Sequence, residues 1–257
     1  MVSALMNTMN LPTSVTDNLA ENDDTDPEAN GWSRAVSLNA DAVSLLLQSD
    51  HTRAVANLSA ALSYITRKVL SDKEPIGGAH PGFPFQVRAS FPFNQRVDPV
   101  ITDSCVSYFE KPFLVEWQCS PQERTSIPLT DEIAAYLSAT CFYNMGLALY
   151  ATFRKHPLQE VWLSKAHDSF LRAFELLSVL KIRSNNPTLL LLLATCNNLA
   201  AIQGDLGNVA LLHFWGDQFQ IVFDFADAQS LWNDSNFHSF RLKKLLHAFA
   251  FSAAGTA

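Results

Sequence analysis

The placement of proline constrains this chain of 257 residues more strongly than any other feature. Eight of its twelve prolines lie between residues 71 and 130. A proline inside a helix removes a backbone hydrogen bond and clashes with the preceding turn, and it also restricts the residue before it. We therefore predict a non-helical, partly extended insertion at about 71–130, flanked by two regions that are free to form helices.

Both flanking regions carry apolar residues at helical spacing. The spacing predicts one helical hairpin from about Trp32 to Leu70, with a polar break at Gln48 to Thr52. After the insertion, the predicted helices are 131–154, 157–182, 187–203, 208–228 and 235–251. We expect the last of these to cap the helical array, because a solenoid needs a terminal unit with a polar outer face.

Within the insertion, short extended runs are predicted at 106–109 and 113–117, where apolar and aromatic residues cluster. Two related Phe-Pro-Phe segments lie within residues 83–96 and place aromatic side chains on a restricted backbone. We expect these segments to pack against the protein itself, although they could also mark a site for another protein. Whether residues 83–96 fill a groove between the helices is left open by the sequence.

Charge is distributed unevenly along the chain. Residues 1–33 contain six acidic and no basic residues and few large apolar ones, which predicts a disordered acidic tail. The remainder, 34–257, is almost neutral and rich in apolar residues, as expected of a packed domain. Nucleic-acid binding is not expected, because no broad basic surface is present to bind phosphate.

Several features indicate the compartment. The four cysteines are scattered without a Cys-x-x-Cys pair, and the first residues have no basic and apolar pattern typical of a secretory signal. The most apolar run, Leu189 to Ala194, is far shorter than the roughly 20 residues of a transmembrane helix. We expect a cytoplasmic protein, or a nuclear one, with no transmembrane segment.

Three hairpins carry small and large residues at a recurring spacing. The positions are Ala42, Leu45, Ser49, Ala54, Leu58 and Ala61; then Asn144 to Tyr150 with Ala166, Phe170 and Ala173; and then Asn197 to Ala200 with Gly207. This pattern resembles the tetratricopeptide repeat, in which small residues let two helices approach closely. The second match is eight residues longer than the first between its two small residues, and the third has Gly216 where a large residue is expected.

The resemblance implies an all-α fold, a TPR-like superhelix of antiparallel hairpins. It also implies a non-enzymatic scaffold that binds a protein or peptide through the concave face of its first helices. The residues that would contact such a partner are Asn39, Val43, Tyr143, Asn144, Leu147, Tyr150, Asn197, Asn198 and Ala201. Because no Lys or Arg accompanies these positions, a clamp for a peptide carboxylate is disfavoured.

No motif for catalysis, metal binding or cofactor binding is present in the sequence. The seven histidines form no His-Glu-x-x-His pair, and there is no nucleophile elbow, phosphate loop or dinucleotide fingerprint. We therefore predict that the protein is not an enzyme and needs no cofactor. Two alternatives remain: an all-α enzyme or small-molecule carrier with a site between the helices and the insertion, and a structural subunit of a homo-oligomer.

Overall fold

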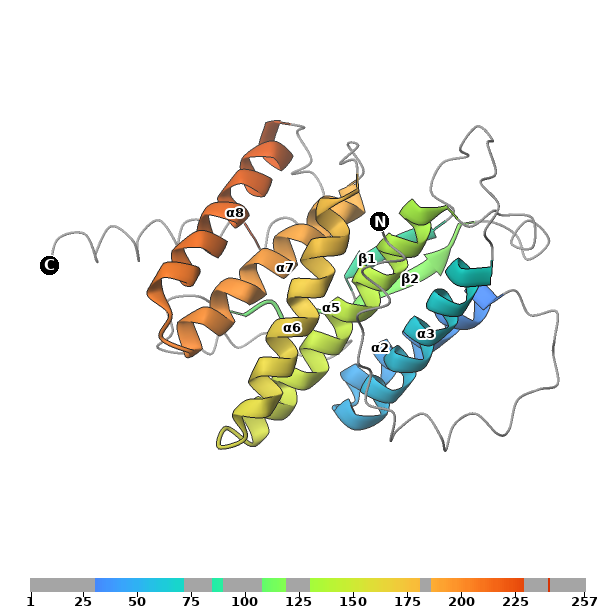
Figure 1. Ribbon diagram of the computed structural model, residues 1–257, viewed down its shortest axis with the longest axis horizontal. Coiled ribbons are helices and arrows are strands. Elements are labelled where there is room, and N and C mark those ends of the chain that lie inside the picture. The colour runs from blue at the N-terminus through green and yellow to red at the C-terminus, as the bar shows by residue number, and fades with distance from the viewer. Residues whose placement is uncertain are drawn as a thin grey trace, which may run out of the picture. The chain divides into compact units, whose positions relative to one another are not determined.

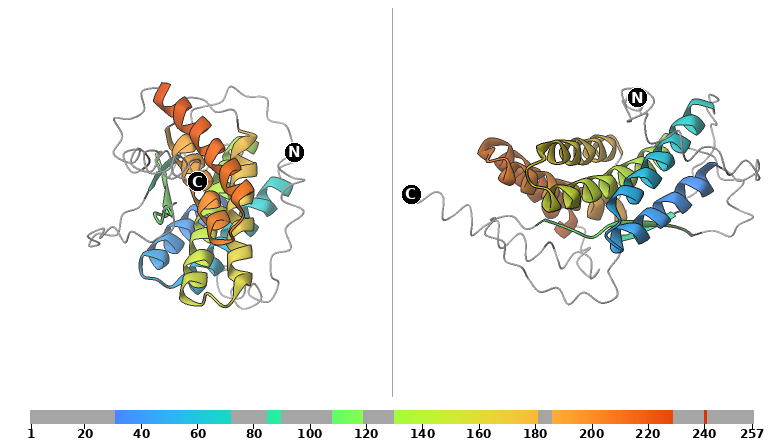
Figure 2. Two further views of the ribbon diagram at one scale, coloured as in Figure 1. Left: turned by 90° about the vertical axis from the view of Figure 1, so that its left-hand side faces the viewer. Right: turned by 90° about the horizontal axis from the view of Figure 1, so that it is seen from below.

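The computed structural model describes residues 31–71, 85–89, 108–118, 130–180, 186–228 and 240. As predicted, these residues are mostly helical, with six helices and one pair of short strands (Figures 1 and 2). The chain divides into two compact units, Met1–Ser90 with Pro112–Leu180 and Phe91–Lys111 with Lys181–Ala257. The predicted tail up to residue 30 and the predicted C-terminal helix, apart from Phe240, lie outside the described residues.

The first hairpin consists of α2 (Gly31–Leu47) and α3 (His51–Ser71), which pack against each other as predicted. Ala42 and Ala54 are completely buried and lie where the repeat pattern places its small positions. Helix α2 begins two residues before the predicted end of the tail. Trp32 explains the difference, since its side chain is buried and anchors the first turn of the helix.

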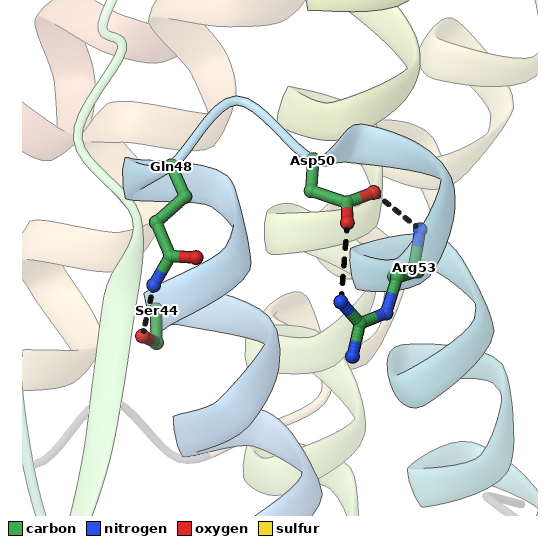
Figure 3. Close-up of polar contacts among 4 residues, drawn as sticks. All are labelled: Ser44, Gln48, Asp50 and Arg53. Atoms are coloured by element: carbon green, nitrogen blue, oxygen red, sulfur yellow. Dashed lines mark hydrogen bonds and ion pairs between the residues drawn. The ribbon is translucent and has the colours of Figure 1, made fainter.

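The turn between α2 and α3 is held by local polar contacts (Figure 3). Ser49 adopts a left-handed conformation with φ of 62° and reverses the chain. Asp50 then begins α3: its carboxylate accepts a hydrogen bond from the Arg53 N–H at 3.2 Å and lies 3.5 Å from the Arg53 guanidinium. Before the turn, Gln48 donates to the Ser44 hydroxyl at 3.2 Å. The predicted polar break is therefore a capped turn.

The second hairpin consists of α5 (Asp131–Lys155) and α6 (Glu160–Ser178). The Thr130 side chain caps α5 by accepting the N–H three residues later at 3.2 Å. Helix α5 is buried along most of its length because it packs against α3 as well as α6. Gly146 is the point of closest approach, since a Cβ atom there would lie only 2.7 Å from the Phe170 ring.

The eight extra residues of this hairpin lie mostly in the helices rather than in the connection. Nine residues follow Gly146 within α5, whereas five follow Ala42 within α2. Six residues separate the start of α6 from Ala166, compared with three from the start of α3 to Ala54. The connections are nearly equal, with four residues against three. The extension therefore lengthens the two helices of this hairpin, and the connection gains only one residue.

A two-stranded antiparallel sheet packs against the first unit's helices. Strand β1 (Phe85–Ala89) pairs with β2 (Phe113–Trp117), so that Phe85 lies opposite Trp117 and Ala89 opposite Phe113. β2 contacts both α2 and α5. The extended run predicted at 113–117 is confirmed, while the described part of the run predicted at 106–109 is not part of a strand.

The second unit contains the hairpin of α7 (Asn186–Asp205) and α8 (Val209–Ala228). Gly207, with φ of 66°, allows the tight reversal between them. Asn208 then caps α8 by accepting the backbone N–H three residues later at 3.2 Å. The apolar run Leu189 to Ala194 is buried in α7, as expected.

Candidate peptide-binding site

The clearest arrangement of polar groups in the first unit is a two-point clamp on the backbone of Phe113. Asn144 projects from α5 and is completely buried. Its side-chain oxygen accepts the Phe113 N–H at 2.8 Å, and its nitrogen donates to the Phe113 carbonyl at 2.8 Å. One amide therefore satisfies both backbone groups of one residue.

Strand β2 explains why the clamp takes this form. In an antiparallel pair, the N–H and C=O of one residue point to the same edge of the strand, and successive residues alternate between edges. Phe113 and Val115 share one edge, and Asn39 from α2 accepts the Val115 N–H at 3.2 Å. The two asparagines thus take the place of a further strand along this edge of β2.

Asn39 also lies against the buried Cys141 thiol of α5. Burial raises the pKa of the Cys141 thiol to about 12, and the nearby Asn39 amide opposes this increase only in part. The thiol is therefore fully protonated at neutral pH and is a poor nucleophile. Cys141 contributes to packing around the asparagine rather than to chemistry.

The Phe113 side chain fills an aromatic pocket beside its clamp. Its ring meets the Tyr143 ring edge to face, with centroids 5.0 Å apart, and Tyr143 in turn meets Phe170 at 5.4 Å. All three side chains are fully buried. Gly146 makes this pocket possible, because any larger residue would collide with Phe170.

The second unit contains a clamp with the same geometry. Asn198 on α7 accepts the Phe109 N–H at 2.8 Å and donates to the Phe109 carbonyl at 3.0 Å. Its neighbour Asn197 donates to the same Asn198 oxygen at 3.1 Å, which fixes the orientation of the amide. Two asparagines on different helices therefore hold two phenylalanines that are four residues apart in the sequence.

Phe109 is also held through its ring. It stacks on Phe240 at 4.7 Å, and Phe240 lies 5.9 Å from Phe219 of α8. The Lys111 ammonium lies 5.7 Å from the centre of the Phe109 ring, at cation–π distance. Partial burial lowers the pKa of Lys111. Each unit thus combines a backbone clamp with an aromatic contact.

All nine residues predicted to contact a partner are buried. Asn39, Asn144 and Asn198 hold the chain's own segment, Asn197 orients Asn198, and Tyr143 contacts the Phe113 ring. Of the other predicted residues, Val43, Leu147 and Ala201 are buried apolar side chains, and the buried Tyr150 ring lies 6.1 Å from the Phe153 ring. Sequence reasoning found the asparagines but missed the residues they hold.

One signal in the sequence bears on what was missed. Asparagines are rare in apolar helical stretches unless they are hydrogen-bonded, so Asn144 and the Asn197 pair needed backbone partners. Whether residues 83–96 fill a groove was left open by the sequence; their described part, Phe85–Ala89, pairs with β2. The phenylalanines at 109 and 113 are the residues that the asparagines bind.

The contacts to the segment come from neutral amides and aromatic rings. Among the described residues, no group of three or more His, Cys, Asp or Glu side chains could hold a metal ion. In the same part of the chain, no helix is long and apolar enough to cross a membrane. The two clamps hold the main chain of Phe113 and of Phe109 through their N–H and carbonyl groups.

No protein-family model, curated protein or solved structure is significantly similar to this chain.

Proposed function

We propose that this protein is a non-enzymatic scaffold, built on TPR-like hairpins, that binds an extended segment of a protein or peptide partner through its asparagine clamps. The observation that carries the proposal is the pair of 2.8 Å hydrogen bonds between Asn144 and the backbone of Phe113. Such bonds recognise a strand by its main chain, as in complexes where a peptide adds to a sheet. Phe113 occupies the clamp of the first unit, and Phe109 occupies the clamp of the second.

The repetition of the clamp supports the proposal. Asn144 and Asn198 lie on α5 and α7, the first helices of their hairpins, where the repeat resemblance places partner-binding residues. Both bind the N–H and the carbonyl of a phenylalanine. Packing alone would be served by apolar side chains, whereas a buried amide is stable only with partners for its polar atoms.

A labelled peptide of residues 108–118 tests this proposal against the full-length chain. In the parent, the internal segment competes at a high effective concentration, so the peptide should bind weakly. Phe113→Ala in the full chain weakens the internal segment, because a buried Phe to Ala change costs about 3–5 kcal/mol. We expect fluorescence anisotropy to show at least tenfold tighter peptide binding to this variant than to the parent.

The same assay contains its own control. A peptide methylated on the backbone nitrogen of the residue corresponding to Phe113 keeps the ring but loses the N–H that Asn144 accepts. It should bind at least tenfold more weakly than the unmodified peptide. Equal binding of the two peptides, or no binding to a Phe113→Ala chain with parental helix content, would contradict recognition through the clamp.

Partners in the cell can be sought by affinity purification with the parent chain and Asn198→Leu in parallel. A partner that binds through the clamps should be recovered with the parent and depleted with the variant. Recovery of the chain itself and nothing reproducible besides would count against a scaffold.

A further inference from the structure

Helix α8 carries a second apolar stripe that is exposed. Its buried stripe consists of Trp215, Phe219, Val222, Phe223 and Ala226. On an adjacent face, the side chains of Leu211, Phe214, Ile221 and Phe225 are 42, 46, 62 and 39% exposed. We name these four residues the α8 outer stripe. A run of large exposed apolar side chains on one face commonly marks an interaction surface.

The spacing of the outer stripe fits a helical partner. Its members, together with the half-buried Gln218, follow intervals of three, four, three and four residues. This is the heptad spacing at which one helix receives the side chains of another. From Leu211 to Phe225 the stripe runs about 21 Å at 1.5 Å per residue, or four turns. A partner helix of about 15 residues would match it.

Phe214 is well placed to anchor such a helix. Its ring meets the buried Trp215 ring edge to face, with centroids 5.0 Å apart, so the exposed ring packs on a buried one. A supported aromatic side chain loses little conformational entropy on binding, which is typical of residues that dominate an interface.

The edge of the outer stripe is acidic. Asp217 and Asp224, one heptad apart, are exposed beside it, and Gln220 holds the Asp224 carboxylate with a hydrogen bond of 2.7 Å. An antiparallel second copy of α8 would bring two such edges together, and like charges oppose that pairing. An anionic membrane surface is disfavoured for the same reason.

We propose that the α8 outer stripe binds an amphipathic helix of another protein, whose apolar stripe is flanked by Lys or Arg. Asp217 and Asp224 select the basic flank, and the four apolar side chains supply the contact. This surface is separate from the asparagine clamps, so the inference does not rest on the proposed function.

Titration of the full chain with synthetic helical peptides tests the inference. The probe is a 15-residue peptide with leucine at heptad positions and lysine at the flanks, and its matched control carries glutamate instead of lysine. A third peptide covers residues 239–251 of this chain, whose Arg241, Lys243 and Lys244 accompany a predicted apolar face. We expect the lysine peptide to bind at least tenfold more tightly than the glutamate peptide.

Variants locate the binding surface. Ile221→Ser with Phe225→Ser should weaken binding of the lysine peptide at least tenfold, whereas Leu158→Ser, at a residue 98% exposed in the first unit, should leave it unchanged. Asp217→Lys with Asp224→Lys should reverse the preference between the two charged peptides. The variants change only exposed side chains, so each should keep the helix content of the parent. Measuring the helix content of each variant checks that it is folded.

Four outcomes would overturn the inference. The first is binding of neither charged peptide to the parent below millimolar concentration. The second is tighter binding of the 239–251 peptide than of the lysine peptide, which would assign the stripe to this chain's own C-terminal segment. The third is a concentration-dependent dimer, seen by light scattering, that the double variant Ile221→Ser with Phe225→Ser abolishes. This result would assign the α8 outer stripe to a second copy of the chain. Binding to anionic vesicles that is lost with the same variants would likewise assign it to a membrane.

Discussion

Replacing Asn144 removes the clamp on Phe113 and leaves two backbone groups without partners. Asn144→Leu keeps a similar volume but has no polar atoms. Each buried group left unsatisfied costs about 1–3 kcal/mol, and the added apolar surface recovers part of this loss. We therefore expect the free energy of unfolding to fall by about 2–4 kcal/mol, a large share of the 5–15 kcal/mol typical of a domain.

Denaturant unfolding measures the loss, and hydrogen exchange locates it. The Phe113 amide should exchange much faster in the variant, because its acceptor at 2.8 Å is gone. Thr140→Val is the matched control, one turn earlier on α5 and equally buried. Its hydroxyl donates to the Tyr136 carbonyl, and its removal orphans no backbone N–H, so it should cost less than about 1 kcal/mol.

The Asn144→Asp variant adds a pH-dependent test of the clamp. At neutral pH, an ionised carboxylate would face the Phe113 carbonyl in a buried site, and burial raises the pKa of such a group. Once protonated, the carboxylic acid can both accept and donate as the amide does. The variant should therefore gain stability relative to the parent as pH falls from 7 towards 5. Equal stability losses for Asn144→Leu and Thr140→Val, or no pH effect in Asn144→Asp, would refute the clamp as a stabilising contact.

Three further predictions concern packing, the thiol and a helix cap. In thermal melts, Gly146→Ala should destabilise the protein by about 1–3 kcal/mol, because the added Cβ meets the Phe170 ring. Gly204→Ala, with open space around the added Cβ, should be neutral or stabilising in the same measurement. Iodoacetamide at pH 8, followed by peptide mass mapping, should leave Cys141 unmodified. The thiol has a pKa of about 12 in the folded chain and about 8.5 in the unfolded chain, so the free energy of unfolding should fall as pH rises above about 8.5. Cys141→Ala should remove the part of this fall that the thiol causes. Asn208→Ala should cost about 1 kcal/mol through the lost α8 cap, and an unchanged denaturation midpoint would contradict that role.

Much of the helical fold could be predicted because its signals are local. Periodicity gave the bounds of α2, α3, α5, α7 and α8 to within about three residues, and proline marked where α3 ends and α5 begins. The turn between α2 and α3 was harder to predict. Ser49 adopts a left-handed conformation normally associated with glycine or asparagine, so its type of turn could not be recognised from the residue itself.

The site was only half predictable because its contacts are distant in sequence. Asn39 and Val115 are 76 residues apart, and Phe109 and Asn198 are 89 apart. A buried asparagine reveals that it needs a partner, but nothing local to Asn144 identifies Phe113 as that partner. The extended run 113–117 was predicted, yet its place against α5 followed only from the structure.

These long separations have a consequence for how the protein folds. The hairpins α2–α3 and α5–α6 form from contacts between neighbours along the chain, which close quickly. The clamped segment can dock only after long loops have closed and after the asparagines that receive it are in place. Refolding should therefore show helix formation first, by far-ultraviolet circular dichroism, and a slower step in which the aromatic rings around Phe113 become ordered.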